Sequence, residues 1–245
     1  MSTAGGMLVV SPTRRECGTV VLGTGSAAGY RLDALLDSST VDTVLSAGFA
    51  GALRPEWPPG TVVICSHVDG VAADTQLVDA AEAAATTANP GHRTRCGRLV
   101  TVVEPVLTPE AKHALATPVP SGGTGDPKTA TGEIVGPDIV DMEAAALLDA
   151  AQAHSVPLVC LRAVIDGAGD TVPAGVGTIL EAQSDPQRPR AAMALAEWSA
   201  FTRSLLRRPR DLPHYWRMGN RSAVARTALQ AAVPAVAGAL SAIVR

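Results

Sequence analysis

Short apolar runs alternate with helical segments through the first two thirds of the chain. Continuous runs of Val, Ile and Leu are typical of strands that are buried on both faces of a sheet. Such runs lie at residues 7–10, 18–23, 42–48, 60–68, 98–103 and 156–164. Segments with helical signals lie between them, at residues 27–37, 76–87, 109–116 and 142–153. This alternation predicts the α/β class.

A different pattern begins near residue 188. We expect helices over residues 190–206 and from about residue 221, with a break at "RRPRDLPHYW" between them. The last helix includes eighteen uncharged residues, "TALQAAVPAVAGALSAIV", which Pro234 is expected to interrupt. We therefore predict a main α/β unit at residues 1–187 and a helical C-terminal extension of the same domain at residues 188–245.

The charge of the chain divides at the same place. From Arg188 onward the net charge is +8, whereas the preceding residues carry −11, within a total of −3. Two interpretations of the basic extension stay open. It packs on the body or on a second subunit, or it contacts a membrane surface with Arg side chains at the headgroups and Tyr215 and Trp216 beside them.

The cysteines, the histidines and the N-terminal residues indicate the cellular compartment and whether a metal is bound. The four cysteines lie far apart and the five histidines show no ligand spacing, so neither a disulfide framework nor a metal site is expected. The N-terminus "MSTAGGMLVVSPTRREC" lacks the pattern of a secretory signal. A cytoplasmic protein without a metal or other cofactor is the prediction, and membrane association depends on the extension.

Two glycine-rich loops follow strands. In "VVLGTGSAAG" the amides of Gly23 and Gly25 are placed to receive an anion, although a plain tight turn explains the pattern equally well. A dinucleotide site would need an acid after the next strand, where "SAGFAGAL" begins with Ser46 instead. Both loops are expected to face one crevice at the carboxyl ends of neighbouring strands.

Two acids stand close to the end of the α/β pattern. In "DIVDMEAAALLDAAQAHSVPLVCLRAVIDGAGD" Glu143 stands at the start of a helix and Asp166 follows a strand. They are either ordinary features of an α/β unit or two halves of one active site.

This segment and "VLSAGFAGALRPEWPPGTVVICSHV" resemble the nucleoside phosphorylase and nucleosidase superfamily, which includes methylthioadenosine/S-adenosylhomocysteine nucleosidase and purine and uridine phosphorylases. The resemblance covers about residues 18–170. It implies a three-layer phosphorylase/hydrolase-like fold with a central mixed sheet and a helical C-terminal appendage, residues 1–187 as a catalytic domain, and a homo-oligomer. It also implies a small nucleoside substrate and no nucleic-acid partner.

The resemblance also implies roles for single residues. Asp166 matches the general acid that protonates purine N7, and Glu143 matches the acid that binds the ribose hydroxyls. Met142 is expected to pack against the ribose, and Arg162 to order the acidic site. The remaining substrate-binding candidates lie in the glycine-rich loops: Gly25, Phe49, Ala50 and Gly51.

The chain departs from the superfamily pattern in ways that leave the acceptor open. Ile165 stands where Ser usually precedes the general acid, and Ser46 and Phe49 stand where phosphorylases carry Arg and Ser. Glu16 is the candidate for a water-activating acid. Water and phosphate therefore both remain as acceptors.

The extension, with "LLRRPRDLPHYWRMGNRSAVARTAL", resembles the hopanoid-associated phosphorylase group. That likeness implies cleavage of the lipid-tailed nucleoside adenosylhopane, with release of adenine. Two alternatives stay open: a soluble nucleosidase of the methylthioadenosine type, and a protein without catalysis that binds nucleosides or associates with membranes.

Overall fold

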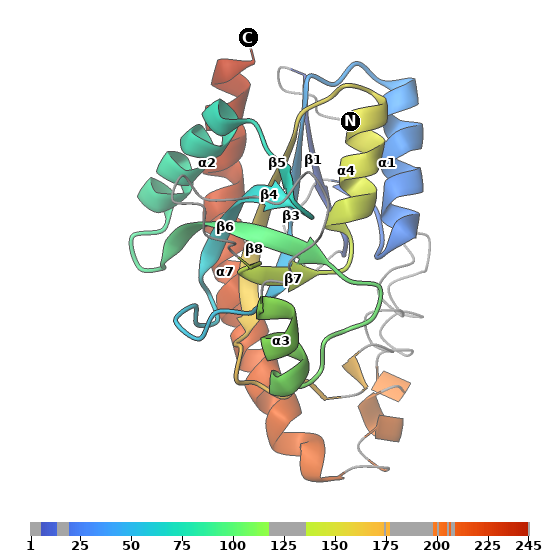
Figure 1. The fold of residues 1–245 in the computed structure, drawn as a ribbon, viewed down its shortest axis with the longest axis vertical. Coiled ribbons are helices and arrows are strands. Elements are labelled where there is room, and N and C mark those ends of the chain that lie inside the picture. Colours follow the sequence, from blue (N-terminus) through green and yellow to red (C-terminus); the bar gives the residue numbers. More distant parts are fainter. Residues whose placement is uncertain are drawn as a thin grey trace.

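The computed structural model describes residues 6–13, 20–117, 136–173, 175–176, 198–199, 201–204, 206 and 209–244. In this part of the chain a mixed eight-stranded sheet forms the centre of the molecule (Figure 1). Its strands are β1 (Met7–Ser11), β2 (Val20–Val21), β3 (Thr43–Ala52), β4 (Val62–Val68), β5 (Val71–Ala72), β6 (Thr94–Thr101), β7 (Ile139–Asp141) and β8 (Leu158–Asp166).

The sheet closes on itself through β8. This strand is parallel to β3 and antiparallel to β4, while β6 pairs with β4 and β7, and β7 pairs back to β3. The strands β3, β8, β4, β6 and β7 therefore form a ring, and β1 and β2 extend the sheet from β3. The ring brings the end of β8 close to β7, although the two strands do not pair with each other.

Helices cover both faces of the sheet (Figure 1). On one side lie α1 (Ser26–Ser38) and α4 (Ala144–Ala153), and on the other lie α2 (Thr75–Ala88) and α7 (Leu212–Ile243). The short helix α3 (Pro109–Ala116) lies at the same end of the molecule as the first half of α7 (Figure 1). The three-layer α/β fold predicted from the sequence is thus confirmed, with a C-terminal helix as part of it.

The strands have two apolar faces because their side chains alternate. In β3, Leu45 and Ala47 pack toward α2 and α7, whereas Val44 and Ala50 pack toward α1 and α4. The layer formed by α1 and α4 is closely packed at Gly29 of α1, where an added Cβ would lie 2.6 Å from the carbonyl oxygen of Ala146 on α4. The low aromatic content is consistent with this construction, because small side chains let the helices approach the sheet.

Helix α7 corrects two expectations about the extension. It begins at Leu212 after a 3₁₀ turn at Pro209–Asp211, so the break expected through residue 216 ends earlier. It also continues through Pro234. Pro234 is exposed, so water can reach the backbone carbonyl of Gln230, which has lost its helical donor.

The second half of α7 supplies a large part of the core. Its buried residues recur at helical spacing and face α2 and the sheet: Ala225, Ala228, Leu229, Ala232, Val233, Val236 and Leu240. By length and composition α7 is long and apolar enough to cross a membrane, but this stripe is packed inside the protein. The buried stripe of this apolar segment thus packs on the body, and contact of the extension with a membrane stays a prediction.

Other elements agree with the sequence to within a few residues, except that β5 and β7 were not expected. Both are very short, and β7 has only three residues. The boundary at residue 187, most of the helix expected at residues 190–206, and Glu16 lie outside the described residues.

Candidate active site

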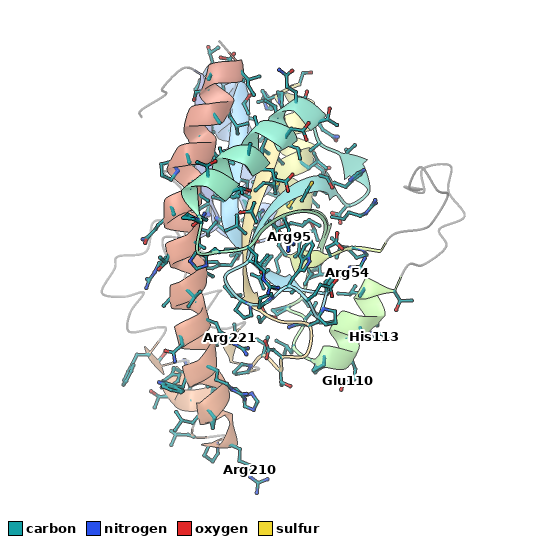
Figure 2. The ribbon with its side chains drawn as sticks, turned by 90° about the vertical axis from the view of Figure 1, so that its left-hand side faces the viewer. Arg54, Arg95, Glu110, His113, Arg210 and Arg221 are labelled. Atoms are coloured by element: carbon teal, nitrogen blue, oxygen red, sulfur yellow. The ribbon has the colours of Figure 1, made fainter. Side chains whose placement is uncertain are left out.

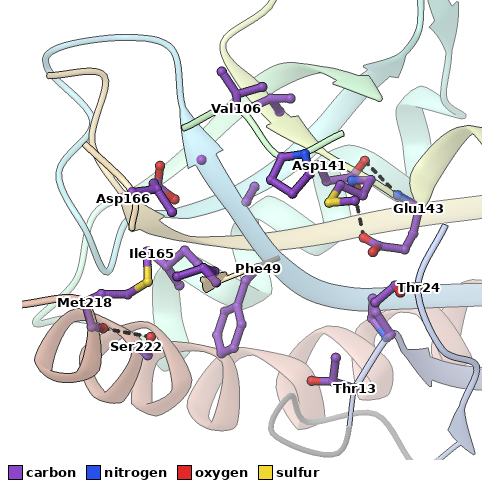
Figure 3. Close-up of a pocket in the computed structure, with 18 of the residues that line it drawn as sticks. Thr13, Thr24, Phe49, Val106, Asp141, Glu143, Ile165, Asp166, Met218 and Ser222 are labelled. Carbon is purple, nitrogen blue, oxygen red and sulfur yellow. Dashed lines mark hydrogen bonds between the residues drawn. The ribbon is translucent and has the colours of Figure 1, made fainter. Parts of the chain in front are cut away.

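A cavity of about 340 Å³ lies at the end of the strand ring, between the sheet and the first half of α7 (Figure 3). Its walls come from β3, β7, β8, the segment before α3, and α7. Six of the residues proposed from the sequence line it: Phe49, Ala50, Gly51, Met142, Glu143 and Asp166. The structure therefore brings the two acids into one cavity, and Figure 3 shows them on opposite sides of it.

A buried ion pair fixes the floor of the site. Arg162, on β8, is fully buried and donates from Nε to Asp141 Oδ2 at 2.9 Å, and from Nη1 to the Ser46 carbonyl at 2.9 Å. Its Nη2 is also 2.9 Å from Asp141 Oδ2, an ion-pair distance without hydrogen-bond geometry. Burial alone would lower the pKa of Arg162, but the Asp141 carboxylate outweighs it and raises that pKa. Arg162 lies behind the cavity wall, consistent with the ordering role proposed for it.

Asp141 also holds the backbone of Glu143 in place. Its Oδ1 accepts the backbone N–H groups of Glu143, at 3.3 Å, and Ala144, at 3.2 Å, at the start of α4. Glu143 occupies the N-cap position, is 7% exposed, and accepts the Met142 N–H at 3.4 Å (Figure 3). A carboxylate at a helix N-terminus is favoured by the helix dipole, so Glu143 sits where an ionised acid is stabilised.

Asp166 ends β8 on the other side and contacts a residue that was not proposed from the sequence. Lys112, on α3, is fully buried, and its Nζ donates to Asp166 Oδ2 and to the Gly167 carbonyl, the latter at 2.7 Å. Burial raises the pKa of Asp166, while the nearby Lys112 ammonium lowers it, and the net direction is upward. Asp166 is thus a carboxyl group that holds its proton more readily than an exposed aspartate.

The turn after Asp166 is held by a second ion pair. Asp170 accepts the Gly167 N–H at 2.6 Å and pairs with Arg221 of α7. Burial would raise the pKa of Asp170, but the hydrogen bonds from Arg221 and Gly167 lower it overall. Asp170 therefore serves as an ionised turn residue, and Arg221 connects α7 to the Asp166 segment (Figure 2).

Gly25, proposed from the first glycine-rich loop, does not line the cavity, whereas its neighbour Thr24 does. Gly25 caps α1 with φ 61°, a conformation that favours glycine, and an added Cβ would meet no atom within 4 Å. Glu16 lies outside the described residues, so its role as a water-activating acid stays a prediction.

The first half of α7 supplies cavity residues that the sequence did not indicate: Tyr215, Met218, Gly219, Ser222, Ala223 and Arg226. They were missed because residues up to 216 were expected to form a break and later ones a separate helix. No sequence signal marked Lys112, since its helix, "PEAKHALA", has an ordinary surface composition. Among the described residues, no cluster of His, Cys, Asp and Glu is arranged to hold a metal ion.

The protein is thus an α/β protein with two buried carboxyl groups lining one cavity, an arrangement typical of enzymes. Residues 3–197 match the sequence pattern of the phosphorylase superfamily. The chain belongs to that superfamily. Among curated proteins none matches the sequence.

Solved structures agree on the fold. A methylthioadenosine/S-adenosylhomocysteine nucleosidase from Colwellia psychrerythraea, in complex with adenine, superposes with a TM-score of 0.62 at 15% identity over 96% of this chain and 95% of that chain. The corresponding nucleosidase of Neisseria meningitidis, in complex with methylthio-immucillin-A, gives 0.53 at 20% identity over 78% and 96%. A futalosine hydrolase mutant of Helicobacter pylori gives 0.51 at 14% identity over 80% and 97%.

Proposed function

We propose that this protein cleaves the N-glycosidic bond of an adenine nucleoside and releases the free base. The observation that supports this most directly is the placement of Asp166 and Glu143 in one cavity with different environments. Both acids are 7% exposed, but burial raises the pKa of Asp166 even beside the Lys112 ammonium, whereas Glu143 stands at a helix N-terminus, where the helix dipole favours a carboxylate. One acid can therefore give a proton while the other stabilises positive charge.

The chemistry follows from where charge develops. As the C1′–N9 bond breaks, its electron pair moves into the purine, and the ribose becomes cationic at C1′. Asp166 transfers its proton to N7, so that neutral adenine leaves. Glu143 accepts hydrogen bonds from the ribose hydroxyls and stabilises the cation until an oxygen of water or phosphate bonds to C1′. When water is the acceptor, it releases one proton as its oxygen bonds to C1′, and Asp166 takes up a proton from solvent to complete the cycle. Met142 and Phe49 supply apolar contacts to the nucleoside.

An apolar 5′ substituent suits the walls of the cavity beyond the two acids. Those walls include Pro105, Val106, Val172, Val176 and Met218. The superposed Colwellia structure holds adenine, and the Neisseria structure holds a methylthio-substituted immucillin. A 5′-modified adenosine with an apolar group is therefore the substrate class we propose.

Adenosylhopane is the particular substrate that the extension favours. Near the first half of α7, which lines the cavity, large apolar side chains are exposed: Leu206 at 80%, Leu212 at 50% and Trp216 at 70%. Arg210, labelled in Figure 2, and Arg217 of α7 are exposed as well. Apolar side chains flanked by arginines suit contact with an anionic lipid surface, from which the nucleoside end of a lipid-tailed substrate could enter the cavity.

The decisive assay measures adenine release from adenosylhopane in liposomes and from methylthioadenosine in buffer, with and without phosphate. Wild type is compared with Asp166→Asn, and Asp149→Asn, which removes an exposed acid of α4, is the matched control. We expect release by wild type and the control, and loss on the order of a hundredfold or more in Asp166→Asn. A requirement for phosphate would identify the acceptor.

The other possible results of this assay decide between the two alternative functions. Release only from methylthioadenosine would reject the hopanoid substrate and leave a soluble nucleosidase. Nucleoside binding without release from either substrate would reject catalysis. The proposed homo-oligomer is tested separately by light scattering of the purified protein, which would read a monomer mass if the proposal is wrong.

A further inference from the structure

Lys112 is the least expected charged residue of the fold. It is 0% exposed, on a helix whose other side chains are exposed or only half-buried. Burying an ammonium group costs free energy unless each of its donors finds a partner. The three acceptors of its Nζ all belong to one short segment: the Asp166 carboxylate, the Gly167 carbonyl at 2.7 Å and the Asp170 carbonyl at 3.4 Å.

These contacts distinguish Lys112 from an ordinary core residue. A lysine that only filled space would extend its ammonium toward solvent, because its stem is apolar and flexible. Here α3 points the ammonium into the protein, at the carboxyl group that faces the cavity. Ile165, which precedes Asp166, offers no hydroxyl to support that carboxyl group. Lys112 is the cationic side chain that hydrogen-bonds to Asp166 among the described residues.

We propose that Lys112 is a positioning residue for Asp166, which holds its carboxyl group toward the purine and compensates the negative charge that Asp166 acquires when its proton leaves. This inference rests on the proposed function of Asp166 as the general acid. In the step concerned, the Asp166 O–H bond breaks, the purine N7–H bond forms, and the new carboxylate forms beside an ammonium that stays protonated. No other reactant is needed.

Other charged groups face Asp166 and also shift its pKa. Asp170, in the same turn, adds a negative charge, and Arg221 from α7 neutralises much of it by pairing with Asp170. A smaller polar cavity on this side is lined by Asp166, Asp170, Arg221, His214 and Arg217. Among the cationic side chains that the structure describes, Lys112 is the one that hydrogen-bonds to the Asp166 carboxylate, so its removal should act on Asp166 more strongly than removal of these neighbours.

The test compares the pH dependence of kcat and kcat/KM for wild type, Lys112→Gln and Lys112→Arg, with Arg95→Gln as the control that removes an exposed cation. The substrate is methylthioadenosine, or adenosylhopane in liposomes if only that is cleaved. For Lys112→Gln, which can still hydrogen-bond to the Gly167 carbonyl, we expect kcat to fall about tenfold or more. In the pH profile of activity, the limb on which activity falls with rising pH should move to higher pH. The reason is that the Asp166 carboxyl group, without its cation, keeps its proton up to a higher pH.

Lys112→Arg should restore the wild-type position of that limb, because it keeps the positive charge. An unchanged limb in a folded Lys112→Gln protein would overturn the proposal and leave a structural role. If Lys112→Gln does not fold, Lys112→Arg alone decides, and a limb at higher pH than wild type would refute charge compensation. Activity retained in Asp166→Asn would instead refute the proposed function itself, so the two failures are distinguishable.

Discussion

Replacing Arg162 with Met should destabilise the protein strongly, because it leaves a buried carboxylate without its partner. Asp141 is 5% exposed and Arg162 is 0% exposed. Breaking a buried ion pair by removing one partner costs about 3–5 kcal/mol, whereas exposed pairs contribute about 0–1 kcal/mol. Met fills much of the same volume, so the loss reports the charge rather than a cavity. For a chain of this size, that loss corresponds to a fall in Tm of about 6–20 °C.

The assay is urea unfolding followed by circular dichroism, with the free energy taken by linear extrapolation. Arg95→Met, which removes an exposed arginine on β6, should stay within about 0.5 kcal/mol of wild type. In the double variant with Asp141→Asn, the neutral amide should recover about 0.5–3 kcal/mol, since no buried charge is left unpaired and the side-chain oxygen still caps α4. A loss below about 1 kcal/mol in Arg162→Met, or no recovery in the double variant, would refute this reasoning.

Three further predictions concern packing and cysteine chemistry. Leu229→Ala should cost about 2–5 kcal/mol in the same unfolding assay, because Leu229 is fully buried between α7 and the sheet. Gly29→Ala should cost about 1–3 kcal/mol, since its Cβ would lie 2.6 Å from the Ala146 carbonyl oxygen, and an unaffected midpoint would contradict the close packing of α1 on α4. Burial raises the pKa of Cys160 to about 11, so a thiol reagent at pH 8 should label exposed Cys96 while leaving Cys160 unmodified until the protein is unfolded, as peptide mapping would show.

The sequence was informative where a local pattern has one physical meaning. Continuous apolar runs had to be strands covered on both faces, and the three layers confirm this for β3, β4 and β8. The three-residue β7 escaped prediction because a strand that short has no periodicity. Pro234 misled because a proline is tolerated on the exposed side of a long helix, and only the fold shows which side is exposed.

Some residues of the candidate site could be found from the sequence, and others could not. Glu143 and Asp166 were identifiable because the segment that holds them resembles the nucleoside phosphorylase and nucleosidase superfamily; their positions at a helix start and a strand end agreed with a shared site but did not require one. Lys112 was not identifiable, because nothing local distinguishes a lysine that turns inward from one that extends into solvent. Its partner, Asp166, is 54 residues away in the sequence, and only the closure of the strand ring by β8 brings the two together.

Helix α7 takes part in both the core and the candidate site of this protein. The half that follows Ala225 is held by the core, so its place is set by packing, whereas the half that begins at Leu212 lines the cavity and exposes apolar side chains. Because a helix is rigid along its length, the buried half fixes where the exposed half stands, and Arg221 ties it to the turn after Asp166. We therefore expect substitutions of exposed residues in the first half, such as Trp216, to alter the proposed lipid contact while the carboxyl groups inside the cavity stay in place.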